Sequence, residues 1–177
     1  KKSDLFNSLS NTYKYSYSKK LILKFKKYKN FRIIGMGGST LGTEAIYDFL
    51  KHKIKKDFIF LDNLKLDSSY FKDKKKTINI IVSKSGNTLE TISNSNLILK
   101  KDNKNIFITE NKDSYLRKIA KNLKAEIVDH NNYIGGRYAV LSEVGMLPAE
   151  LMGLNEKNFK QFNALIKDNS FINCLLH

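Results

Sequence analysis

The chain has 177 residues, a length that predicts one globular domain with its own hydrophobic core. Its formal net charge of +15 would suit a nucleic-acid-binding protein, but only three of its 32 basic residues are arginine, on which base readout largely depends. We therefore expect no nucleic-acid partner. We also expect no membrane association, because no apolar run approaches the roughly 18 to 20 residues of a membrane span.

Short β-branched and aromatic runs alternate with longer amphipathic runs, which is typical of an α/β fold with a mostly parallel sheet. Five of the short runs are apolar enough to predict strands that are buried on both faces. These strands are Phe31 to Ile34, Phe58 to Leu61, Thr77 to Val82, Asn105 to Ile108 and Ala125 to Val128.

Helical spacing of apolar residues predicts helices between the strands and after the last one. They cover Leu41 to Leu50, the stretch after Thr88, Leu116 to Leu123, Ser142 to Met152, and Asn155 to about Lys167. We expect residues 1–30 to form an N-terminal helical segment, residues 31–153 the main domain and residues 154–177 a C-terminal helical segment.

A glycine-rich turn, Gly35-Met36-Gly37-Gly38-Ser39-Thr40-Leu41-Gly42, follows the first strand. Its glycines let the backbone approach a ligand closely and expose its amides. The turn departs from the dinucleotide fingerprint G-x-G-x-x-G, because Thr40 stands in place of the third glycine. A nucleotide site that uses this turn and Asp62 stays open as an alternative, as does a packing turn that binds nothing.

A second turn, Ser83-Lys84-Ser85-Gly86-Asn87-Thr88, lies between the third strand and a helix. The free amides and the positive dipole end of a helix N-terminus attract phosphate, and hydroxyl groups can complete its shell. Gly86 allows the left-handed conformation of an anion-binding nest. Because an ordinary helix cap accounts for one hydroxyl and not three, the turn predicts a phosphate site formed by Ser83, Ser85 and Thr88.

Three motifs carry a family resemblance. Ser83 to Thr91 resembles the phosphate loop of sugar isomerase (SIS) domains, and Asn132 to Ala149 resembles a signature segment of the glucose-6-phosphate isomerase family. With Ile34 to Ser39, they stand in that family's order over most of Phe31 to Gly153, the region expected to be its first SIS domain. The resemblance implies an SIS-type three-layer sandwich, in which a five-stranded parallel sheet is flanked by helices.

The resemblance also implies an activity and a set of site residues. The family interconverts glucose 6-phosphate and fructose 6-phosphate through an enediolate, with no cofactor and no metal. Arg137 would stabilise the enediolate oxyanion as the catalytic residue. Hydroxyl groups and backbone donors would bind the substrate at Gly38, Ser39, Ser83, Lys84, Ser85, Thr88 and Gly136.

Some positions depart from the family pattern. The family usually has a small hydroxyl residue at Ala139, and a small residue or proline at Glu143, where a carboxylate would add negative charge near the pocket. The pair Gly86-Asn87 also resembles shorter bacterial and archaeal sugar isomerases, so phosphomannose activity is left open.

Family members continue into a second SIS domain and a C-terminal region, and these parts carry the catalytic glutamate, the ring-opening histidine and a late lysine. His130 and His177 do not match the histidine's motif. We expect a fragment that binds phosphosugars with an incomplete active site and that is a homodimer when complete. A single cysteine, Cys174, suits a reducing cytoplasm. A stand-alone SIS module that senses sugar phosphates is the alternative.

Overall fold

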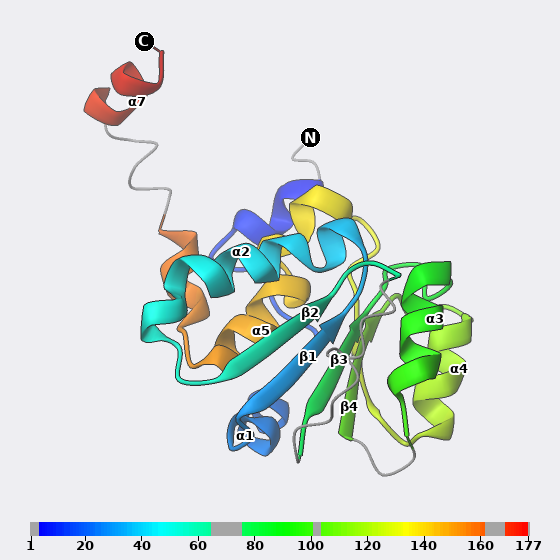
Figure 1. Cartoon of the computed structure of the whole chain (residues 1–177). Coiled ribbons are helices and arrows are strands. Elements are labelled where there is room, and N and C mark those ends of the chain that lie inside the picture. The colour runs from blue at the N-terminus through cyan, green and yellow to red at the C-terminus, as the bar shows by residue number, and fades with distance from the viewer. Residues whose placement is uncertain (1–3, 65–75, 101–103, 162–168, 177) are drawn as a thin grey trace.

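The computed structural model describes residues 4–64, 76–100, 104–161 and 169–176, and its centre is a parallel sheet (Figure 1). The sheet has five strands in the order β2-β1-β3-β4-β5. The strands are β1 (Asn30–Ile34), β2 (Asp57–Leu61), β3 (Ile78–Val82), β4 (Lys104–Thr109) and β5 (Glu126–Asp129). All five predicted strands are present, with bounds that differ by no more than one residue. The expectation that all five are buried on both faces holds for β1, β3 and β4 and is wrong for β2 and β5, which are partly exposed because they lie at the edges of the sheet.

Helices cover both faces of the sheet, so the predicted three-layer sandwich is confirmed (Figure 1). One face packs against α1 (Lys19–Lys26), α2 (Leu41–Leu50) and α5 (Glu143–Met152). The other face packs against α3 (Leu89–Ile98) and α4 (Tyr115–Asn122). Short 3-10 helices lie at η1 (Asp4–Leu9), η2 (Gly37–Ser39), η3 (Lys51–Lys53) and η5 (Gly136–Leu141).

The segment after α5 differs from the expected long helix. It forms a 3-10 helix, η6 (Glu156–Lys160), and residues 162–168 of the predicted helix lie outside the described residues. Helix α7 (Asn169–Leu176) follows and lies away from the sheet in Figure 1.

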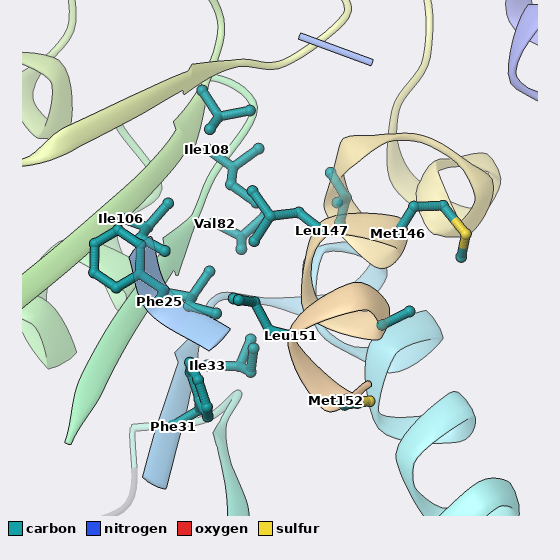
Figure 2. Close-up of a cluster of buried hydrophobic side chains, with 14 of the residues drawn as sticks. Phe25, Phe31, Ile33, Val82, Ile106, Ile108, Met146, Leu147, Leu151 and Met152 are labelled. Atoms are coloured by element: carbon teal, nitrogen blue, oxygen red, sulfur yellow. The ribbon is translucent and has the colours of Figure 1, made fainter. Parts of the chain in front are cut away.

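Helix α5 is the centre of the larger core, because nine of its ten residues are buried. Figure 2 shows Leu147 and Leu151 of this helix beside Val82 and Ile33 of the sheet. Pro148 lies inside the helix and has no N–H to donate to the carbonyl of Val144.

Helix α2 supplies the hydrogen bond that Pro148 cannot make. Thr43 Oγ1 on α2 donates to the Val144 carbonyl at 3.2 Å. The proline therefore leaves no unsatisfied carbonyl at this position, and α2 and α5 are tied together next to the C-terminal ends of the strands.

A row of buried polar side chains crosses the other face of the sheet. Arg32, Asn79 and Asn105 stand in register on β1, β3 and β4. Arg32 donates to Asn79 Oδ1 at 3.1 Å, and Asn79 donates to Asn105 Oδ1 at 2.9 Å. A shift of one residue in any of these strands would break the row, so it helps to specify the register.

None of the helices in the described part of the chain is both long enough and apolar enough to cross a membrane.

Candidate functional site

The strand order reverses direction between β1 and β3, which makes this pair the topological switch point of the sheet. The chain leaves β1 for β2 on one side and later returns to β3 on the other side. In open parallel sheets, ligands bind at such a switch point, beyond the carboxyl ends of the strands. The turn after Ile34 and the loop after Val82 both lie at this point, since β1 and β3 are parallel neighbours.

The loop from Ser83 to Thr88 brings its three hydroxyl groups together. The Thr88 hydroxyl lies 2.9 Å from Ser83 Oγ and 3.4 Å from Ser85 Oγ. Backbone amides hold both serines, because Gly86 N donates to Ser83 Oγ at 3.1 Å and Asn87 N donates to Ser85 Oγ at 3.2 Å. The cluster is therefore a preformed set of hydroxyl groups that face one another.

Helix α3 begins directly behind this cluster. Thr88 is its N-cap residue, yet the Thr88 side chain makes no capping hydrogen bond. The amides of Leu89, Glu90 and Thr91 donate to no other residue that the structure describes. These amides and the positive end of the helix dipole can bind an anion at the hydroxyl cluster.

Gly86 fixes the shape of the loop. It has φ +67°, in the left-handed region, and a Cβ added there would lie 2.2 Å from Ser114 Oγ. The next residue, Asn87, accepts a hydrogen bond from Tyr115 N at 2.9 Å. The loop therefore rests on the start of α4 at a position that only glycine fits without strain.

The glycine-rich turn touches the Gly-Gly-Arg segment, although the two are far apart in the sequence. A Cβ added at Gly38 would lie 2.2 Å from the backbone C and O of Gly136. The next residue along, Ser39, is partly exposed, and no described residue bonds its hydroxyl. The contact places Gly136 and Arg137 beside the turn that follows β1.

Arg137 is exposed and lies in η5. Its guanidinium makes no hydrogen bond or ion pair with the residues in the described ranges. A permanent positive charge without an internal partner is available to a negatively charged ligand. The structure brings together the hydroxyls of Ser83, Ser85 and Thr88, and it brings Gly38 together with Gly136, the residue before Arg137.

Glu143 lies in the first turn of a helix, where an acidic residue is readily accommodated. It is buried at the start of α5, where Oε1 accepts from Asn131 N and Oε2 accepts from the Tyr13 hydroxyl, both at 2.7 Å. Both carboxylate oxygens are thus occupied by the protein. The Glu143 carboxylate therefore fixes the backbone at Asn131, ahead of Gly135 and Gly136.

Glu110 and His130 lie near Lys84 of the phosphate loop, although the sequence did not point to Glu110 and His130 does not match the family's histidine motif. Each follows a strand end and is buried. Burial raises the pKa of Glu110, but the hydrogen bond and charge of Lys112, with the charges of Lys84 and His130, bring it below its usual value. Only the fold reveals this cluster, because its members come from separate strand ends.

Burial lowers the pKa of His130 below its usual value of 6.5. A hydrogen bond to the Asn131 backbone and the charges of Glu143 and Glu110 act in the opposite direction, and the charge of Lys84 lowers the pKa further. His130 therefore takes up a proton less readily in the folded protein than an exposed histidine does.

This predicts a pH dependence of stability. Because the pKa is lower in the folded state, the unfolded state takes up the proton first, and stability should fall as the pH drops through about 6.5. His130→Gln should show a smaller fall in Tm between about pH 7.5 and about pH 5.5 than the wild type. Thermal unfolding followed by circular dichroism would measure it. His52→Gln, at an exposed position, is the control, and an unchanged pH dependence in His130→Gln would contradict the prediction.

A separate cavity of about 710 Å³ lies between the N-terminal segment and η6. It is lined by Asn11, Tyr13, Tyr15, Glu156, Lys157, Lys160 and Gln161. This lining contains none of the predicted site residues. No group of three or more potential metal ligands occurs within the described ranges.

Comparisons with known proteins agree with the fold and the motifs. The family model for phosphoglucose isomerase matches residues 18–174. A protein of Borreliella burgdorferi (strain ZS7), named glucose-6-phosphate isomerase, is 34% identical over 174 residues, which cover 82% of this chain and 33% of the relative. The chain thus spans about a third of that relative's length.

Solved structures share the architecture. A hypothetical protein from Thermus thermophilus matches with a TM-score of 0.69 and 24% identity, over 84% of this chain and 41% of the other. Tagatose-6-phosphate ketose/aldose isomerase from Escherichia coli matches with a TM-score of 0.63 and 15% identity, over 82% and 45%. At these identities, the likeness concerns the fold.

Proposed function

This chain belongs to the phosphoglucose isomerase family, and from that premise we propose that it is the phosphosugar-binding first SIS domain of an aldose-ketose isomerase. The proposed substrates are glucose 6-phosphate and fructose 6-phosphate. The observation that carries the proposal is the cluster of three hydroxyl groups in front of the free N-terminus of α3. The SIS domain would cover residues 31–153, with helical segments at 1–30 and 154–177.

The phosphate would bind at the strand ends of β1 and β3. The hydroxyls of Ser83, Ser85 and Thr88 would donate to its oxygens, together with Ser39 and the first amides of α3. The turn at Lys84 would add backbone donors. Such an arrangement suits a dianion, because several donors and a helix dipole converge on one point.

The sugar would extend from the phosphate towards Gly38, Gly136 and Arg137. The reaction moves a proton between C1 and C2 and creates a negatively charged enediolate oxygen. The Arg137 guanidinium would stabilise that oxygen as its charge develops. The backbone contact between Gly38 and Gly136 supports this direction, because it brings the two glycines together beside the turn that follows β1.

Two acidic residues of α5 are poor candidates for the base that moves this proton. Glu143 is held by Asn131 and Tyr13, and Glu150 accepts from the Tyr17 hydroxyl at 2.7 Å. A base must reach the proton that it abstracts. We therefore expect the pure chain to bind phosphosugars weakly and to leave them unconverted; turnover well above background in a coupled assay would contradict this.

Removal of a loop hydroxyl tests the phosphate site directly. Ser85→Ala or Thr88→Ala should weaken the binding of fructose 6-phosphate and of inorganic phosphate alike, each by about 1 to 3 kcal/mol. The effect is the same for both ligands because the hydroxyls contact only the phosphate. Isothermal titration calorimetry would measure it, with Ser93→Ala on α3 as the control. Unchanged affinity in both variants would place the phosphate elsewhere.

Two other functions would give different results in binding and activity measurements. A stand-alone SIS module that senses sugar phosphates would bind the ligand but would stay inactive when joined to the family's second domain. A nucleotide site at Gly35 to Gly42 and Asp62 would bind NAD in preference to fructose 6-phosphate. A homodimeric state and a cytoplasmic location also belong to this proposal, and light scattering would test the former.

A further inference from the structure

We infer that the side chains of Lys84 and Glu143 form a clamp on residues 131 and 132, and that this clamp holds the Gly135-Gly136-Arg137 segment against the phosphate loop. The inference deepens the proposed function and rests on it, because it concerns the same site. In this arrangement Lys84 and Glu143 are positioning residues. They would make the sugar-binding segment depend on the loop that binds the phosphate.

Lys84 makes the first half of the clamp. Its Nζ donates to the carbonyl of Asn132 at 2.7 Å and lies 3.6 Å from Glu110 Oε1. Its backbone is fixed as well, because the Lys84 carbonyl accepts from Glu110 N at 3.1 Å. The side chain therefore reaches from a rigid point in the phosphate loop to the chain that follows β5.

Glu143 makes the second half from the other side. Its Oε1 accepts from Asn131 N at 2.7 Å, one residue before the carbonyl that Lys84 holds. The carboxylate is fixed by its place in the first turn of α5 and by the Tyr13 hydroxyl. The negative Glu143 thus binds the amide of Asn131, and the positive Lys84 binds the carbonyl of Asn132. Both hydrogen bonds involve a charged group and are therefore stronger than hydrogen bonds between neutral groups.

The clamp acts directly on the Gly135-Gly136-Arg137 segment. A Cβ added at Gly135 would lie 3.0 Å from both Cδ and Nζ of Lys84, so the lysine chain packs against this backbone. Gly136 follows immediately and touches Gly38. Arg137 is the next residue, and its exposed side chain has no described partner that could position it. Its position therefore depends on the backbone that Lys84 and Glu143 hold.

Amide hydrogen exchange of the ligand-free chain tests the clamp. Lys84→Met keeps the apolar stem but removes the donor, and it should speed exchange in residues 131–137 by about tenfold, with β3, β4 and α5 unchanged. Lys112→Met is the matched control, because Lys112 also pairs with Glu110, at 2.5 Å, but has no described contact with residues 131–136. Glu143→Gln, which keeps an acceptor for Asn131 N, should speed exchange less.

Titrations with two ligands test the coupling. Lys84→Met should weaken fructose 6-phosphate binding about tenfold more than the binding of inorganic phosphate, whereas Lys112→Met should change both by the same factor. Wild-type exchange at 131–137 in Lys84→Met would overturn the clamp. An equal rise in the exchange rate throughout the sheet would also overturn the clamp, because it would indicate general destabilisation. If the wild type binds neither ligand, the proposed function fails, and the exchange data still decide the clamp.

Discussion

Alanine at Gly38 should lower the free energy of unfolding by about 1 to 3 kcal/mol and abolish most of the phosphosugar binding. The added Cβ would lie 2.2 Å from the Gly136 carbonyl carbon and oxygen, which is far inside van der Waals contact. Because both sides of this contact are backbone, no side chain can rotate away. The glycine-rich turn and the Gly-Gly-Arg segment must then separate, and the groups that the two segments would offer to the sugar move apart.

Gly37→Ala in the same turn separates this contact from simple backbone strain. Gly37 has φ +53°, but a Cβ there would meet nothing within 4 Å. Gly37→Ala should therefore lower the free energy of unfolding only by the strain of the left-handed conformation, about 1 to 2 kcal/mol. It should reduce ligand binding less than Gly38→Ala does. Urea unfolding and calorimetry with fructose 6-phosphate would give both quantities. If Gly38→Ala bound the ligand like the wild type, the two segments would not act together in binding the sugar.

The strands could be predicted because each is a short apolar run that lies in the middle of the sheet or under its helices. Ile80, Ile106 and Ile33, for example, are fully buried, and short runs of β-branched residues between turn residues favour buried strands. The strand order could not be predicted from these runs, because apolar patterns do not identify neighbours. The hydrogen bonds that join Arg32, Asn79 and Asn105 could not be predicted either, because a charged residue within a strand does not indicate its partners.

The meeting of the three loop hydroxyls could be predicted because these residues are close together in the sequence. Ser83, Ser85 and Thr88 lie within one turn, so local geometry decides how their hydroxyls meet. The clamp could not be predicted in this way. Lys84 and Glu143 come from distant segments, and their common target at Asn131 and Asn132 exists only when β3, β5 and α5 are packed.

Arg137→Ala should lower kcat by on the order of 10² to 10³ in an enzyme of this family that carries this segment with its catalytic base. The reason is that the enediolate oxygen gains its charge only during the reaction, so the loss falls on the transition state. The substrate phosphate, in contrast, is equally charged throughout. Thr88→Ala should therefore mainly raise KM, and it serves as the comparison.

The fold should tolerate the change at Arg137. The side chain is exposed and has no hydrogen bond or ion pair with the described residues, so Arg137→Ala should leave Tm close to that of the wild type. Arg137→Lys should restore part of kcat, because an ammonium group keeps the charge but not the planar pair of donors. Steady-state kinetics in both directions would measure these effects. A raised KM with unchanged kcat in Arg137→Ala would mean that the guanidinium binds the substrate equally before and during the reaction, and the role in stabilising the enediolate would then be wrong.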